Sequence, residues 1–302
     1  MASHTLERIP TLGPEREPAR SSGFWGRLTR NRTGCASLLF IAVVVLAAVF
    51  GPLIYPIDAT KVDFSSINAG PSPVHPLGTD RLGHDTLARL LAGLRVSLLV
   101  AALVEAINIL LGATLGLVAG YFGGWLDTGI ARLADMLFAF PGLLLAILVA
   151  ATFGQWVTEN YGSTARLLLV AGSISLVSWP LMARYVRGQT LSLRERDFVL
   201  AARAIGRNES GILRVHILPN VAGLIITAAT LDMVGAIVGE ATLSLLGLGI
   251  QAPNTSLGKM IVEGVPFLAQ NSLLVFVPAA MLTLLVLAFS FLGDALRDAV
   301  GR

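Results

Sequence analysis

Charged residues are scarce in this sequence of 302 residues. Only 14% are Asp, Glu, Lys or Arg, whereas 54% are hydrophobic, and soluble domains usually carry about 25% charged residues. The apolar residues are gathered into runs near the ~20 residues with which a helix crosses a hydrocarbon layer of ~30 Å, and not into short alternating stretches. The composition therefore excludes an ordinary soluble domain, and the run length excludes an outer-membrane β-barrel.

Cysteine and lysine are also nearly missing. Cys35 is the only cysteine, so no intramolecular disulfide can form, and its place before an apolar run gives no sign of a lipoprotein or redox role. The two lysines, Lys61 and Lys259, do not follow the glycines of a phosphate-binding P-loop. We therefore expect this chain to bind no cofactor, and any ATP with its Mg²⁺ to be bound by another polypeptide.

Few residues could support covalent or metal chemistry. The only histidines are His4, His75, His84 and His216, without a His-Glu-x-x-His pattern, and two loop histidines alone supply too few metal ligands. Gly172-Ser173 lacks the Gly-x-Ser-x-Gly pattern of a nucleophile elbow. The sequence thus predicts a non-catalytic membrane subunit with no catalytic residue and no metal site.

Six apolar runs predict an all-α membrane protein with six transmembrane helices. The first run is not followed by a small-residue cleavage site, so we expect it to remain as a membrane anchor. The six expected spans are residues 36–54, 96–118, 130–153, 167–186, 221–246 and 273–291.

The basic residues indicate topology. Placing both termini in the cytoplasm puts sixteen of the 22 Lys and Arg residues on that side, as the positive-inside rule favours. The net charge of +3 comes from arginines flanking apolar runs and forms no basic stripe interleaved with aromatics, so nucleic acid is not an expected partner. A multi-pass protein of the cell (inner or plasma) membrane is predicted.

The chain divides into three parts. Residues 1–33 are polar and rich in Pro, Ser, Glu and Arg, which predicts a mobile cytoplasmic tail. Residues 34–95 are expected to hold the first span and an extracytoplasmic segment of turns. Residues 96–302 form the core, with five spans and a long cytoplasmic loop at 187–220.

That loop predicts two short helices joined by a turn. Ala201 and Ala202 leave a small face for close approach by a partner, Gly206 suits a turn that a Cβ would oppose, and Asn208 can cap the second helix. Pro219 is expected to close it. On spacing alone the unit is either a structural hairpin or a docking element.

The same segment resembles the conserved cytoplasmic loop of ATP-binding cassette (ABC) importer permeases, namely Glu-Ala-Ala, three residues, Gly, nine residues, and a hydrophobic-x-Leu-Pro ending. Leu200 stands where that family has glutamate, and His216 takes the hydrophobic position. The resemblance implies that a coupling helix seats in a groove of the nucleotide-binding subunit. It assigns this ATPase-coupling role to Leu200, Ala201, Ala202, Gly206, His216, Leu218 and Pro219.

Further blocks are similar to the second, C-type permease subunit of dipeptide, oligopeptide and nickel importers. Gly83-His84-Asp85 departs from that subfamily's usual Gly-Arg-Asp. The matching blocks are residues 75–80 with 83–85, 120–125, 139–141, 178–180 and 240–251. This resemblance implies a type I importer architecture, in which the chain forms a heterodimer with a homologous permease. It also implies two ATPase subunits or one fused ATPase, an extracytoplasmic substrate-binding protein, and di- or oligopeptides as substrate.

Four acids fall in or near the expected spans, where a charged residue facing lipid costs ~2.5–3.5 kcal/mol. Either they line the translocation path or they make interhelical hydrogen bonds. An ion-coupled secondary transporter or channel that uses these acids is the alternative function, and an intramembrane enzyme is disfavoured because no catalytic motif is present. The four are Glu105, Asp135, Asp232 and Glu240.

Overall fold

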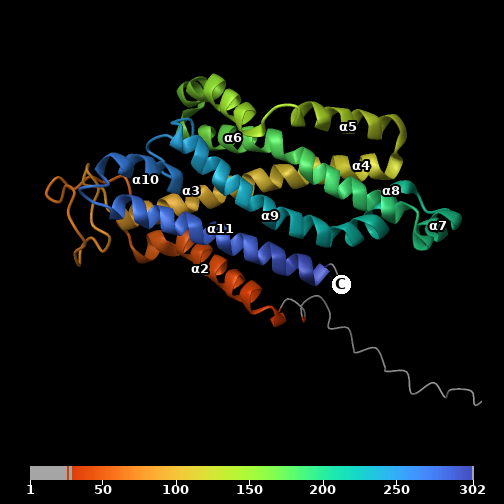
Figure 1. The fold of residues 1–302 in the computed structure, drawn as a ribbon, viewed down its shortest axis with the longest axis horizontal. Helices are drawn as coiled ribbons and strands as arrows, with labels where there is room; N and C mark the ends of the chain where they lie inside the picture. Colours follow the sequence, from red (N-terminus) through yellow and green to blue (C-terminus); the bar gives the residue numbers. More distant parts are fainter. Residues whose placement is uncertain (1–25, 27–28, 301–302) are drawn as a thin grey trace, which may run out of the picture.

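The computed structural model describes residue 26 and residues 29–300, which are helical apart from turns and two isolated β-bridges. The long helices lie roughly side by side (Figure 1). In chain order the elements are α2 (Arg32–Ile54), α3 (Thr86–Ile107), η1 (Asn108–Ala113), α4 (Thr114–Phe122), α5 (Gly124–Phe138), α6 (Gly142–Arg194), α7 (Asp197–Ala204), α8 (Glu209–Ile212), η2 (Leu213–Ile217), α9 (Leu218–Leu245), α10 (Leu257–Gly264), η3 (Val265–Phe267) and α11 (Leu273–Val300). The predicted all-α class is confirmed, and most of the expected tail lies outside the described residues.

Within the described residues, five helical stretches are long and apolar enough to cross a membrane by length and composition. They are Arg32–Ile54, Thr86–Phe122, Gly142–Arg194, Glu209–Leu245 and Leu273–Val300. The expected spans at 36–54, 221–246 and 273–291 fall in α2, α9 and α11. The second starts earlier than expected, because the Asp85 carboxylate caps α3 by accepting a hydrogen bond from the Ala88 N–H at 2.7 Å.

The expected continuous span at 130–153 is wrong. α5 ends at Phe138 and α6 begins at Gly142, with Pro141 as its N-cap. Proline has no N–H for the helical ladder and restricts the residue before it, so the helix breaks here. Figure 1 shows α5 and the start of α6 as separate pieces joined by a short connection.

α6 reverses direction at Gly162, whose φ of 81° and ψ of 173° are not helical. A Cβ on Gly142 would lie 3.4 Å from the Cβ of Val177, and one on Gly154 would meet the Arg166 guanidinium. These pairs can meet only if the two arms of α6 run antiparallel. Counting α5 and the first arm as one broken crossing gives six crossings, and this count, like the orientation of the termini, remains a prediction.

Close packing of η1 and α4 on α6 depends on three glycines. Cβ atoms on Gly112, Gly116 and Gly120 would lie 2.5–2.8 Å from backbone carbonyl oxygens of α6. The glycines recur every fourth residue and therefore share one helix face. Small residues at such a spacing let two membrane helices approach backbone to backbone.

The main hydrophobic core lies where α2, α3, α6, α9 and α11 meet. A second core cluster joins α4 and the second arm of α6 to the segment that contains α7, α8 and η2. The short helices therefore pack on the ends of the long ones, at the right of Figure 1.

Candidate functional site

The predicted helix–turn–helix between α6 and α9 is present, and we call residues 197–217 the hairpin segment. α7 ends near Gly206, which has a φ of +81°, a region that glycine occupies without strain. The Asn208 side chain caps α8 by accepting a hydrogen bond from the Gly211 N–H at 3.0 Å. The turn chemistry expected from the sequence is therefore correct.

The expected small face is divided between two environments. Ala202 is buried together with Val199, Ile212 and Ile217 in the second core cluster, whereas Ala201 is exposed. Ala202 thus packs against its own chain, because residues 199 and 202 lie on one helix face. The contact of Ala201 and Ala202 with a partner stays a prediction, and Ala201 is the one of the two that is exposed in this structure.

The exposed surface of the hairpin segment carries large apolar side chains among charged and polar ones. Leu200 is 47% exposed, and Ile205, just before the turn glycine, is 83% exposed. A large aliphatic side chain gains about 1.5–3 kcal/mol when it is buried, so Ile205 is suited to contact another protein. The sequence analysis did not single out Ile205. A branched aliphatic residue directly before the turn glycine Gly206 could have indicated an exposed contact residue.

Polar contacts fix the hairpin segment to α4 and α6. The Tyr121 hydroxyl at the end of α4 donates to a carboxylate oxygen of Glu209. Arg203 Nη2 donates to the Tyr121 oxygen at 3.3 Å, and its Nε lies 3.5 Å from Glu209. The hydrogen bond to Tyr121 and the charge of Glu209 raise the pKa of Arg203. Arg194 Nη1 also donates to the backbone carbonyl of Tyr121 at 3.3 Å, so α6, α7 and α8 all contact α4 at this tyrosine.

The remaining expected coupling residues lie where the hairpin segment enters α9. His216 packs beside Phe198, with ring centroids 6.3 Å apart, and Leu218 is 39% exposed. Pro219 lies in the first turn of α9 and does not end a helix, so the expectation that it closes the second short helix is wrong. The π turn of η2 bonds the Leu218 N–H to the Leu213 carbonyl, and this wider register accommodates a proline that has no N–H.

Two of the four membrane acids, Glu240 and Asp135, have hydrogen-bonding or charged partners. The buried Glu240 carboxylate accepts hydrogen bonds from Ser97 Oγ at 3.0 Å and Ser244 Oγ at 2.7 Å. Asp135 pairs with Arg184 at 3.2 Å, and both side chains are more than half exposed. These contacts satisfy the carboxylates by interhelical hydrogen bonding and pairing.

Glu105 on α3 and Asp232 on α9 are different. Glu105 is 6% exposed and accepts a 3.5 Å hydrogen bond from Asn108 through Oε2. Its Oε1 and the Oδ2 of Asp232 are buried without a hydrogen-bond partner among the described residues. Asp232 lies in the wall of a cavity of about 350 Å³. The structure thus separates the four acids into two pairs with different surroundings.

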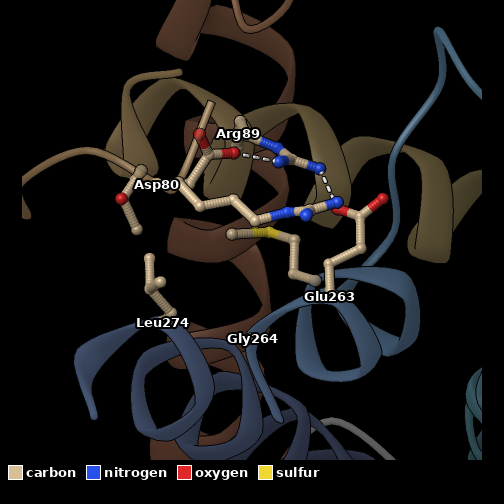
Figure 2. Close-up of a pocket in the computed structure, with 8 residues that line it drawn as sticks. Asp80, Arg89, Glu263, Gly264 and Leu274 are labelled. Carbon is tan, nitrogen blue, oxygen red and sulfur yellow. Dashed lines mark hydrogen bonds and ion pairs between the residues drawn. The ribbon is translucent and has the colours of Figure 1, made fainter. Parts of the chain in front are cut away.

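At the opposite end from the hairpin segment, Arg89 joins α3 to α10. Figure 2 shows its guanidinium between the carboxylates of Asp80 and Glu263, to which it donates. Burial alone would raise the pKa of Asp80, but hydrogen bonds from His84 and the charge of Arg89 lower it below its ordinary value. These four side chains, which we call the Arg89 cluster, hold the 55–85 segment against α10.

A neighbouring contact holds the other loop histidine. His75 Nδ1 lies 2.8 Å from an oxygen of Asp85, and the Tyr55 hydroxyl donates to the same oxygen at 2.8 Å. Burial and the Asp85 carboxylate raise the pKa of Tyr55 to about 12. Among residues 29–300, no group of three or more His, Cys, Asp or Glu side chains is placed to hold a metal ion.

Comparison with solved structures shows the fold. An inward facing structure of the MetNI methionine ABC transporter in its CY5 native crystal form is similar with a TM-score of 0.55 and 18% identity. The match covers 71% of this chain and 97% of that chain. The CY5 SeMet soak crystal form of the same transporter gives a TM-score of 0.55 at 19% identity, over 70% and 96% of the two chains. The chain therefore has the ABC importer permease fold.

Sequence comparisons are more specific. The glutathione transport system permease protein GsiD of Escherichia coli O6:K15:H31 is 37% identical over 98% of this chain and 94% of its own length, and GsiD of Shigella boydii serotype 4 gives the same values. Residues 21–71 match the N-terminal transmembrane domain of oligopeptide transport permease C. Residues 112–302 match the inner membrane component of binding-protein-dependent transport systems. The chain belongs to the family of inner membrane permease components of binding-protein-dependent transport systems, in its peptide-type branch.

Proposed function

We propose that this ABC importer permease subunit forms a translocation path for di- and oligopeptides together with a second, homologous permease. It couples to two ATPase subunits, or one fused ATPase, through the hairpin segment and the start of α9, residues 200–219. An extracytoplasmic binding protein delivers the substrate. ATP and Mg²⁺ are bound by the partners, and this chain performs no covalent chemistry.

The coupling proposal rests on two exposed apolar side chains, Leu200 and Ile205, which we call the apolar tip of the hairpin segment. Leu200 and Ile205 remain open although the same segment buries Val199 and Ala202 in its own core. A segment fixed by a core and by Tyr121 can transmit a push as one body. An apolar tip on such a body is suited to a groove in another subunit.

The substrate class is supported by the relatives. GsiD is named as a permease of a glutathione transport system, and the amino-terminal match is to an oligopeptide permease. Both names concern short peptides or peptide-like molecules. We therefore place this chain's substrate among short peptides.

An ion-coupled transporter or channel is the second candidate, and the unpartnered carboxylate oxygens of Glu105 and Asp232 are what favours it. Intramembrane acids commonly mark ion or proton pathways. Its signature is transport that follows an ion gradient and needs no ATPase.

Co-purification tests the coupling proposal. The chain is expressed with its native partners and purified through a tag, and retained ATPase subunits and solute-stimulated ATP hydrolysis are measured. Ile205→Asp is expected to reduce ATPase retention about tenfold or more, because a charge replaces an aliphatic contact of about 1.5–3 kcal/mol. Val74→Asp makes the same change at a side chain that is 65% exposed in the 55–85 segment and serves as the matched control.

The outcomes separate the candidates. Retention and coupling unchanged in Ile205→Asp would contradict docking through this tip. A chain that purifies without any ATPase and moves solute along an ion gradient would support the ion-coupled alternative instead.

A further inference from the structure

A cavity of about 350 Å³ lies between α3, α5, α6 and α9. This volume falls within the ~300–1,000 Å³ range of small-ligand sites. Its wall is mostly apolar and includes Val104, Leu143, Ile174 and Val177. The cavity can therefore accommodate a group the size of an amino-acid side chain.

Two polar side chains, Ser178 and Asp232, line this apolar wall. The Oδ2 atom of Asp232 has no hydrogen-bond partner, and within the described residues Asp232 forms no ion pair. Leaving a buried acceptor unsatisfied costs about 1–3 kcal/mol, and more when it is charged. A solute that brings a charged N–H donor into the cavity would remove this cost.

A second carboxylate lies behind the first. Glu105 is 6% exposed, its Oε1 is also unpartnered, and the charge of Asp232 acts on it. Glu105 is held by Asn108, which in turn accepts a 2.9 Å hydrogen bond from Ser178 Oγ. The wall therefore presents one acid, Asp232, with the Glu105 carboxylate close enough to act on it and with no basic side chain in the lining, and it favours a cation.

A purely structural role explains the Glu105 and Asp232 carboxylates poorly. Glu240, two turns further along α9, has two hydroxyl donors at 2.7 and 3.0 Å, which is how a packing carboxylate is satisfied. Asp232 has no such donors, and the cavity wall continues along its helix face with Gly235 and Gly239. No atom lies within 4 Å of a Cβ built on Gly235, so open space is left beside the carboxylate.

We propose that Asp232, with Glu105 behind it, binds the ammonium group of the translocated solute while the apolar wall receives the neighbouring side chain. This inference rests on the proposed function, since it requires the cavity to be part of the solute path. It adds a chemical requirement: the solute carries a free amino group.

Direct binding to the complete importer tests this inference. The complex of permeases and ATPases is purified without its binding protein and placed in lipid nanodiscs, and equilibrium dialysis measures binding of radiolabelled trialanine and N-acetyl-trialanine. Omitting the binding protein removes its own selectivity. We expect acetylation to weaken binding about tenfold, as loss of a charge-assisted hydrogen bond would.

Variants locate the effect. Asp232→Asn should weaken trialanine binding about tenfold and remove the preference over the acetylated peptide, whereas Asp232→Glu should keep the preference. Asp298→Asn makes the same acid-to-amide change at an exposed residue of α11 and should alter neither value. Because the comparison of the two peptides uses the wild-type complex, it remains decisive even if Asp232→Asn fails to assemble.

Three results would overturn the inference: equal binding of both peptides to the wild type, no binding of either at millimolar concentration, or an unchanged preference in Asp232→Asn. ATP-dependent peptide uptake by the wild-type complex with its binding protein is measured separately. Uptake without an amine preference removes only this inference. An amine preference without ATP-dependent uptake removes the proposed function and retains the site.

Discussion

The glycines that bring α4 against α6 provide a sharp test of the packing. In Gly116→Ala, the new methyl carbon would lie 2.5 Å from the Ala183 carbonyl oxygen and 3.0 Å from the Val186 Cβ. Neither neighbour can move away easily, because one is backbone and Val186 is buried in the core. Overpacking of this kind typically costs 1–3 kcal/mol.

The expected result is a lower unfolding temperature of the purified complex, followed by intrinsic fluorescence during heating. At about 2–4 °C per kcal/mol for large domains, Gly116→Ala should lower the midpoint by roughly 2–12 °C. Gly188→Ala is the matched control, since Gly188 lies in α6 with no atom within 4 Å of an added Cβ. There the substitution should be neutral or stabilising by up to about 1 kcal/mol.

Equal midpoints for the two variants would refute the reasoning. They would mean that α4 and α6 are further apart in the assembled protein, or that the helices separate without cost. A fall in the control alone would place the sensitive surface on the other face of α6.

Three further predictions concern the ends of the molecule. Gly206→Ala should lower the free energy of unfolding by about 1–2 kcal/mol, because the φ angle of residue 206 is +81°. The same substitution should lower solute-stimulated ATP hydrolysis, and unchanged hydrolysis would argue against a rigid turn. Tyr121→Phe should leave assembly intact but loosen the hairpin segment, which amide hydrogen exchange would detect as faster exchange at residues 199–212. Unchanged exchange would contradict the role of the Tyr121 hydroxyl in fixing the segment. Since the folded pKa of Asp80 is below its ordinary 3.8, the stability that it contributes is complete above that pH and is lost as the pH falls through the lower folded value. The unfolding temperature of the wild type should therefore drop more steeply than that of Asp80→Asn below about pH 4.

The sequence predicted those membrane helices whose apolar residues form one continuous run. The apolar runs of α2, α9 and α11 are continuous, so length alone identifies them. The second span was placed ten residues late because Arg89 and Arg95 look like loop residues. In the structure Arg89 is neutralised by Asp80 and Glu263, and such pairing is invisible in the sequence.

The site was predicted in its turns and missed in its tertiary contacts. Gly206 and Asn208 act through neighbours in the chain, and local chemistry is enough to read them. Tyr121 and Glu209 are 88 residues apart, and the burial of Ala202 depends on α8 and η2 folding back over α7. No local pattern separates Ala201 from Ala202, because only the packed hairpin segment makes one of them face inward.

The π turn at η2 does more than accommodate Pro219. Because helix continues from Glu209 to Leu245, Glu209, beside the turn of the hairpin segment, and Asp232 lie on one rod, about 35 Å apart at 1.5 Å per residue. A tilt of about 5° at one end of such a rod displaces the other by roughly 3 Å, about the diameter of a water molecule. A small rotation imposed at the surface would therefore be enough to widen or close the wall beside Asp232, with no chain of side-chain rearrangements between the two places.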